Sequence, residues 1–430
     1  MRSLPRGLDP LSDETLTGYI LRLAHRLGTS PGMVAIRTGL TGRRRDNVLF
    51  RVPIRFLHDL GPEQVRAFAQ STRLAPEEVS RLLTSSLAER YGPLSEKFTP
   101  RKSAARMVND NAWLLTHTPR YCPQCLVGDG SEIQQLHGGS WQRSWRLPPI
   151  FACTKHRRLL RISCPTCRQP VHTVEMNSII ARPWDEDLHP TQCRTTIAPR
   201  TIGRLQPACG AQLAEPGGVP SEELPDVQTL EHLLGLQRRL QDLLDPVGPA
   251  MTPCVGWLIP AADYFADLRA LLGLVFLSWP AGRSFAATPA LAEALDHDAE
   301  QRHVRARTLR DRPGKKHSSR PFTDPPLDPL LMGAVLGIAE RLLDADDEEQ
   351  ARERMLPLIH QASDLDQALS LYLRRQAWMS FPLRVAIMNH FNHMAPMRQI
   401  IARGPIPEGG REEPKSKGYC RAPRSRLRGA

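Results

Sequence analysis

The sequence lacks the long hydrophobic run that a membrane span or a signal peptide requires. Its longest apolar stretch, residues 271–279, is far shorter than the roughly 20 residues that cross a bilayer, and residues 1–7 contain no apolar core of signal-peptide length. We therefore expect a soluble, cytoplasmic protein without membrane contact. In such a reducing compartment, the nine cysteines are better explained as metal ligands than as disulfides.

Common catalytic motifs are missing as well. No Gly-x-x-x-x-Gly-Lys-Ser/Thr phosphate loop and no His-Glu-x-x-His motif occurs, and none of the 14 histidines is followed two positions later by the glutamate that a zinc deaminase requires. Acidic residues can converge in space from distant positions, but we interpret Asp263, Asp267, Asp296 and Asp298 as helix-surface and capping residues. The sequence predicts a protein that is not an enzyme.

Positive charge is concentrated in two short segments. Residues 302–320 contain eight Lys/Arg and one Asp, and residues 403–430 contain eight Lys/Arg and three Glu, which together account for the whole net charge of +12. Each run alone is compatible with a solvated linker or tail. Their shared sign favours nucleic acid, with contacts to the phosphate backbone and no reading of bases. The predicted DNA-binding side chains are Arg302, Arg305, Arg307, Arg310, Arg312, Lys315 and Lys316.

Helical periodicity dominates the first 118 residues. Leu16, Ile20 and Leu23 share an apolar face, Gly28 is placed to end that helix, and Ser30 with Pro31 begins the next. A second pair is expected at residues 63–71 and from Pro76 onward. Helical hairpins of this kind resemble helix-turn-helix elements, although ordinary helix packing produces them too.

Paired cysteines replace the helical pattern between residues 120 and 213. Two residues between ligands allow one tight turn to present both side chains to a single tetrahedral ion. Taken in chain order, the ligands predict two zinc sites, the second of which has widely spaced final cysteines, so that His189 is an alternative ligand there. The first site comprises Cys122, Cys125, Cys153 and His156, and the second Cys164, Cys167, Cys193 and Cys209. Four protein ligands leave no open position for water, which indicates structural sites.

The order of cysteines and aromatics resembles the TniQ family over about residues 1–213. The residues that carry the resemblance are Leu4-Pro5, Asp13-Glu14-Thr15-Leu16, Leu21-x-Leu23-Ala24, Arg120-Tyr121-Cys122-Pro-x-Cys125, Trp141, Trp145, Cys153-x-x-His156, Leu160 and Cys164-Pro-x-Cys167. We expect the two tryptophans to pack against the zinc ribbons, with stacking on an exposed base as the alternative. The family often closes its second ribbon with Cys-x-Cys-Gly, whereas Pro207 stands here before Ala208-Cys209-Gly210.

The resemblance implies an accessory protein of transposition that contains helix-turn-helix elements and zinc ribbons. Such proteins help to choose the insertion target or link it to an ATPase and a transposase, and some serve CRISPR-type effector complexes. We therefore expect a DNA-binding adaptor, with a free-standing zinc-dependent DNA-binding regulator as the alternative.

The remaining sequence is helical again, with helices expected at residues 230–244, 261–277, 289–310, 329–343, 365–378 and 382–393. The expected fold is mainly α with small zinc-ribbon, treble-clef-like modules. We predict an N-terminal helical part (1–118), a tandem zinc-ribbon region (119–213), a linker (214–228), a C-terminal helical domain (229–402) and a basic tail (403–430).

Overall fold

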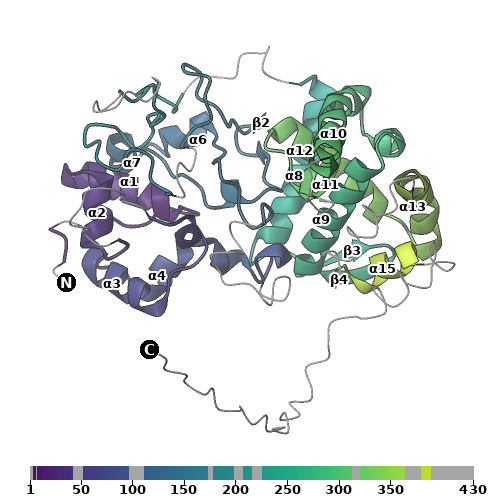
Figure 1. The fold of residues 1–430 in the computed structure, drawn as a ribbon. Helices are drawn as coiled ribbons and strands as arrows, with labels where there is room; N and C mark the ends of the chain where they lie inside the picture. The colour runs from purple at the N-terminus through teal and green to yellow at the C-terminus, as the bar shows by residue number, and fades with distance from the viewer. Residues whose placement is uncertain are drawn as a thin grey trace, which may run out of the picture.

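A computed structural model of the chain confirms the expected fold class, since helices dominate the part of the chain that the structure describes and the strands in that part form two small hairpins (Figure 1). The structure describes residues 3–5, 7–41, 52–95, 111–172, 178–197, 207–215, 225–311, 320–363 and 379–388. The N-terminal helices and the long C-terminal helices lie at opposite ends of the molecule, and the cysteine-rich segment lies between them.

Four helices form the N-terminal end, as the sequence predicts. They are α1 (Leu16–Leu27), α2 (Pro31–Arg37), α3 (Pro62–Thr72) and α4 (Pro76–Arg81), with 3-10 turns η1 (Ile54–Leu57), η2 (Thr84–Leu87) and η3 (Gly92–Leu94). Thr15 caps α1 by accepting a hydrogen bond from the Gly18 amide, and Gly28 ends that helix with φ 57°. Ser30 caps α2, where its hydroxyl accepts from the Met33 amide at 3.3 Å.

The apolar faces of these helices are buried in the core of the N-terminal end. Leu16, Ile20, Leu23, Val34 and Ala35 are buried in a cluster that runs from Leu4 to Leu83 and includes Ile179 and Ile180 of the cysteine-rich segment. Both helical hairpins therefore serve core packing. Their use in reading a DNA groove stays a prediction.

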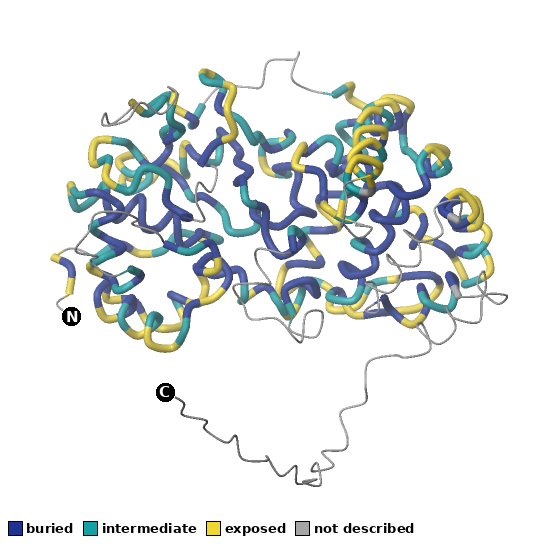
Figure 2. Tube along the Cα trace, viewed as in Figure 1, coloured by how far each residue is buried: buried dark blue, intermediate teal, exposed yellow. Residues whose placement is uncertain are grey.

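Regular structure is sparse in the middle of the chain. It consists of the short helices α6 (Pro123–Val127) and α7 (Glu132–His137), the 3-10 turn η5 (Ser144–Arg146) and a hairpin of β1 (Ala152–Cys153) and β2 (Arg158–Leu159). In that hairpin Ala152 pairs with Leu159 and Cys153 with Arg158. Many residues here are nevertheless buried (Figure 2), so contacts other than backbone ladders hold the chain.

Long helices form the C-terminal part. They are α8 (Val227–Leu244), α9 (Ala261–Leu277), α10 (Pro289–Arg310), α11 (Arg320–Thr323), α12 (Pro329–Leu343), α13 (Glu348–Ser363) and α15 (Phe381–Met388), with the 3-10 turn η8 (Ala281–Phe285) and a hairpin of β3 (Met251–Cys254) and β4 (Trp257–Pro260). The bounds of α9, α10 and α12 are as predicted. No sequence pattern predicted α13 or the hairpin. The predicted helix at 365–378 and the end of the one at 382–393 lie outside the described residues.

A single apolar cluster joins the cysteine-rich segment to the C-terminal helices. It extends from Leu87 to Ile387, and α9 lies at its centre, buried on nearly every side. Gln237 of α8 seals the contact, since its buried side-chain oxygen accepts from the amides of Phe151 (2.7 Å) and Ala152 (2.8 Å). Within the described ranges, no helix is both long and apolar enough to cross a membrane.

Candidate metal centre

The first cysteine cluster is assembled by a short helix and a hairpin. Cys122 and Cys125 lie at the start of α6, while Cys153 ends β1 and His156 lies in the turn before β2. Tyr121 and Arg161 exchange backbone hydrogen bonds of 2.9 and 2.8 Å, which fix the two halves of the cluster against each other. The sequence-predicted ligands of the first site therefore converge.

The ligand atoms of this cluster are spaced as a tetrahedral ion would space them. His156 Nδ1 lies 3.4, 3.2 and 3.5 Å from the Sγ atoms of Cys122, Cys125 and Cys153, and the last two sulfurs are 3.6 Å apart. A tetrahedral zinc ion with Zn–S bonds of about 2.3 Å separates its sulfur ligands by about 3.8 Å. These four residues can therefore hold one metal ion.

The electrostatics of the sulfurs also suit a cation. Hydrogen bonds from the thiols of Cys125 and Cys153 lower the pKa of Cys122 to about 2, and the same bonding to Cys122 raises the pKa of Cys125. The thiolate of Cys122 is thus stabilised. A bound ion would deprotonate the other two cysteines as well, since thiolates are the ligand form.

The second cluster is brought together by backbone pairing that the sequence did not reveal. Residues on either side of Cys193 and Cys209 pair as antiparallel bridges, Gln192 with Gln212 and Thr196 with Ala208. The Cys193 amide donates to Ala211 O (2.9 Å) and the Cys209 amide to Thr195 O (2.8 Å). These bonds place the two single cysteines opposite the Cys164–Cys167 turn.

Sulfur spacing in the second cluster again fits a tetrahedral ion. Sγ of Cys164 lies 3.8 Å from that of Cys209, and Sγ of Cys167 lies 3.9 Å from that of Cys193. All four ligand atoms lie within 4.8 Å of one another. The two predicted groups of four are thus each brought together, and the described residues can hold two metal ions.

His189, the alternative ligand for the second site, lies elsewhere. Its Nε2 donates to Leu136 O at 3.3 Å, and its Nδ1 accepts from the Thr191 amide at 3.3 Å. Its ring also packs edge-on against His25 of α1. Both ring nitrogens are therefore engaged between the N-terminal end and the ribbon region, away from the sulfurs.

Trp141 and Trp145 pack inside the protein, as expected, and neither is available to stack on a base. Both rings are buried, and Trp141 Nε1 donates to Pro190 O at 3.0 Å. The Trp141 ring packs against the rings of Tyr121 and His172, with centroid distances of 5.9 and 4.6 Å. These aromatics build the small core that joins the two cysteine clusters.

Buried arginines tie the cysteine-rich segment to its neighbours, and sequence reasoning missed their role. The Arg120 guanidinium donates to the carbonyls of Pro148 (2.7 Å), Ile150 (2.8 Å), Pro326 (3.0 Å) and Leu327. Burial lowers the pKa of Arg120 to about 10. Because planar guanidinium donors point in fixed directions, this side chain holds the ribbon against the segment before α12.

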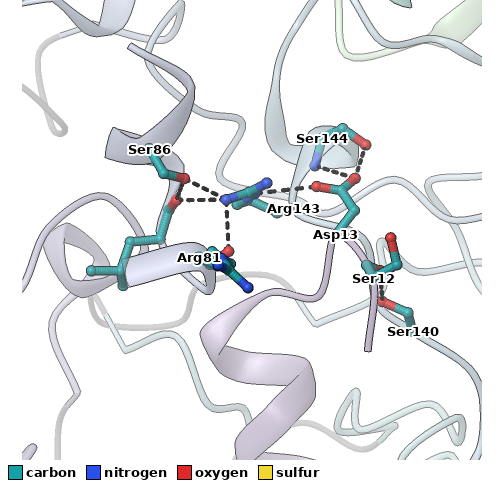
Figure 3. Close-up of polar contacts among 8 residues, drawn as sticks. Ser12, Asp13, Arg81, Ser86, Ser140, Arg143 and Ser144 are labelled. Atoms are coloured by element: carbon teal, nitrogen blue, oxygen red, sulfur yellow. Dashed lines mark hydrogen bonds and ion pairs between the residues drawn. The ribbon is translucent and has the colours of Figure 1, made fainter. Parts of the chain in front are cut away.

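Arg143 plays the corresponding part toward the N-terminal end (Figure 3). It pairs with Asp13 at 3.2 Å and donates to Arg81 O at 2.6 Å and to the Ser86 hydroxyl. Asp13 also accepts from the amide of Ser144 at 3.2 Å. One arginine thus joins the chain before α1, the end of α4 and the segment before η5.

The predicted DNA-binding residues are not equivalent. Arg305 and Arg307 are exposed on α10. The prediction that Arg302 binds DNA was wrong, because this residue is buried and pairs with Asp298 at 2.6 Å. Its guanidinium also donates to Pro321 O and Asp324 O and lies over the Phe276 ring. These internal contacts leave it unavailable for phosphate. The side chain of Arg310, and Arg312, Lys315 and Lys316 entirely, lie outside the described residues.

One of the acidic residues was also misinterpreted. Asp296 and Asp298 are half-exposed on α10 and form ion pairs, as helix-surface residues do. Asp267 is fully buried on α9, where it accepts from the Ser380 amide at 2.8 Å and from Cys254 Sγ at 3.5 Å. Burial raises the pKa of Asp267 to about 7. Its interpretation as a helix-surface residue was wrong, because the hairpin and α15 cover it.

A comparison with known families bears directly on this architecture. The family model of TniQ matches residues 5–160, from the chain before α1 to the end of the first cysteine cluster. This part of the chain, less than half of its length, thus resembles the TniQ family. The resemblance inferred from the sequence over about residues 1–213 is thereby confirmed for residues 5–160, and the match ends before the second cysteine cluster. No curated protein matches the chain.

Proposed function

We propose that this chain is a zinc-containing, DNA-binding adaptor of transposition that links target-site recognition to a transposition ATPase and transposase. The observation that carries the proposal is the position of the first cysteine cluster inside the TniQ region. The cluster and the buried arginines around it give the TniQ region a rigid frame that continues into the C-terminal helices. A CRISPR-type effector complex is a further candidate partner.

Zinc is the metal that this ligand chemistry favours. Three cysteines with one histidine, and four cysteines, are the ligand sets of structural zinc sites. Each set supplies four protein ligands, so an ion bound there retains no open position for water or substrate. Both ions would hold the ribbon together, and the chain would act by binding and not by catalysis.

DNA contact is assigned to the exposed side of α10 and the basic run that follows it. Arg305 and Arg307 point to solvent, and a surface cavity of about 420 Å³ lies beside Arg305 between α10 and α11. Arginines of this kind displace counterions from phosphates without reading bases. Arg310, Arg312, Lys315 and Lys316 extend the same charge along the chain.

The proposal is tested by DNA binding as a function of salt and by reconstituted transposition. Replacing Arg305, Arg307, Arg310 and Arg312 by Ala should weaken binding to all duplexes alike. The slope of log K against log salt should become shallower by about 0.9 for each phosphate that the variant no longer neutralises. Arg302→Ala serves as the contrast, since it should lower stability and leave the salt slope unchanged.

Omitting the chain from a reconstituted reaction should abolish or randomise target choice while strand transfer by the transposase stays chemically possible. Site choice that ignores its removal would contradict the adaptor. Binding to one promoter-like sequence, together with no effect on transposition, would favour the free-standing regulator instead.

A further inference from the structure

The β3–β4 hairpin exposes an entirely apolar outer face. Met251 pairs with Pro260 and Pro253 with Leu258, and residues paired across antiparallel strands share a face. All four are exposed, Leu258 at 68% and Met251 at 46%. Among the described residues nothing covers this face, and solvent-exposed apolar residues that adjoin one another commonly mark an interaction site.

Two aromatic side chains extend this apolar area beside the hairpin. Trp257 is 50% exposed and Phe381, the first residue of α15, is 57% exposed. Their ring centroids are 5.9 Å apart in an edge-on arrangement. We call Met251, Pro253, Leu258, Pro260, Trp257 and Phe381 together the hairpin surface.

The hairpin surface is fixed from beneath, which suits it for binding. Asp267 of α9 accepts a hydrogen bond from Cys254 of β3 and another from the Ser380 amide at the start of α15. Ser380 in turn accepts from the Leu383 amide at 3.4 Å. One buried carboxyl group thus holds the hairpin and α15 side by side, as Figure 1 shows. A preorganised surface loses less conformational entropy on binding.

An acidic corner adjoins the turn of the hairpin. The Val255 amide donates to Leu343 O at 2.8 Å, and a Cβ at Gly256 would lie 2.4 Å from Asp346 O. The corner, formed by Asp344, Asp346, Asp347 and Glu349, is exposed. No ion pair engages these four carboxylates within the described ranges.

The negative charge of the acidic corner limits the kinds of partner that can bind the hairpin surface. Nucleic acid is disfavoured because its phosphates would face the carboxylates. Face-to-face pairing of two copies would oppose two acidic corners, since a two-fold interface brings the same patch of each copy together. The chain's own residues 403–430 are basic, but they are rich in Gly and Pro and offer only Ile406, Tyr419 and Leu427 as large apolar anchors, far apart.

We infer that the hairpin surface, with its acidic corner, docks a polypeptide segment of another protein whose apolar side chains are flanked by lysine or arginine. This inference rests on the proposed adaptor function, because it specifies the chemistry of the protein that the adaptor would engage. Aromatic and aliphatic anchors would supply affinity, and the acidic corner would select basic over acidic partners.

The test uses the full chain and two labelled amphipathic peptides, one of Leu and Lys and a matched one with Glu in place of Lys, in a fluorescence anisotropy titration. The parent protein should bind the Lys peptide and bind the Glu peptide at least about tenfold more weakly. Leu258→Glu should weaken binding of the Lys peptide about tenfold or more, whereas Val247→Glu, at a 94% exposed residue just before β3, should not.

Charge reversal sharpens the same experiment. Asp346→Lys with Glu349→Lys should invert the preference toward the Glu peptide, while Asp347, which caps the start of α13 by accepting from two amides, is left intact. Equal binding of the two peptides by the parent, or equal binding by Leu258→Glu and Val247→Glu, would overturn the inference.

A photo-crosslinking residue at position 258 identifies the occupant. Crosslinks to the Lys peptide support the inference, whereas crosslinks to any other segment of the same chain or to a second copy would show that the surface serves the chain itself and would overturn it. DNA binding by Leu258→Glu should equal that of the parent. A parent that binds the Lys peptide but no DNA would therefore contradict the proposed function and leave the docking surface standing.

Discussion

Residues 111–172 and residues 225–277 pack into one apolar cluster, yet different interactions hold their backbones. The longest helix of the first segment, α7, has six residues, whereas α8 and α9 have 18 and 17. In the helical segment, the backbone hydrogen bonds within each helix and the packing of apolar side chains suffice to hold the backbone in place. In the cysteine-rich segment, the ligand clusters, Arg120 and the side chain of Gln237 hold the backbone in place instead.

The comparison shows that a segment with little regular structure can be as buried as a helical one if its polar groups find fixed partners. It also explains why buried arginines gather near the clusters. Arg120 and Arg146 donate to backbone carbonyls that no ladder satisfies. The two segments should therefore respond differently to loss of metal and to loss of packing.

Removal of a ligand should have the largest effect and should separate the two segments most clearly. Cys153→Ser should lose one metal ion, raise protease sensitivity in residues 119–172 and leave α9 resistant, because structural zinc sites contribute about 10–16 kcal/mol of binding free energy in model peptides. Elemental analysis and mass spectrometry of limited digests would measure both effects.

Cys254→Ala is the matched control, since this buried cysteine lies in β3 and outside both clusters. It should retain two ions. If Cys153→Ser retains two ions as well, or melts like the parent, the ligand assignment is wrong.

The contact between the segments should depend on one amide side chain. Gln237→Leu removes the acceptor of two buried amides, those of Phe151 and Ala152, and each unsatisfied amide costs about 1–3 kcal/mol. Urea denaturation should therefore show a loss of about 2–6 kcal/mol with the metal content unchanged.

Gln241, one helical turn further along α8, provides the comparison. It is half-buried, and its side-chain oxygen accepts from the Thr154 hydroxyl at 2.8 Å. Gln241→Leu should cost no more than about 1.5 kcal/mol. Equal losses in the two variants would mean that Gln237 does not hold the segments together.

The contrast between the segments also sets what the sequence could predict. Residues 261–277, 289–310 and 329–343 were placed correctly as helices because proline or a change of apolar pattern marks their ends. The two cysteine groups followed from ligand spacing. Cys193 and Cys209 reach the second site through antiparallel bridges between residues that are far apart in the sequence. No local sequence pattern predicts such bridges.

Long-range contacts also explain the errors. Arg302 fits a basic run by composition, but Phe276 and the segment around Pro321 enclose it. Asp267 fits a helix surface by residue type, but β3 and the start of α15 cover it. Both depend on which element packs on which helix face. The domain boundaries drawn from the sequence, and the DNA-binding role of the basic run, stay predictions.

The smallest expected effect concerns pH and lies wholly within the helical part. Burial keeps the Asp267 carboxyl protonated in the folded protein up to about pH 7, whereas the unfolded chain releases that proton near pH 4. Between these values the folded state binds more protons, so the contribution of Asp267 to the free energy of unfolding falls as pH rises and levels off above pH 7.

Asp267→Asn retains an oxygen acceptor for Ser380 and cannot ionise. From pH 5.5 to 7.5 the parent should therefore lose about 2 kcal/mol relative to the variant in urea denaturation. Glu14, whose pKa burial also raises to about 7 beside Arg22, titrates in both proteins and cancels in the difference, as do the cysteine clusters. Parallel stability curves for the two proteins would mean that Asp267 is ionised throughout, and the hydrogen bonds beneath the hairpin surface would then be those of a buried carboxylate anion.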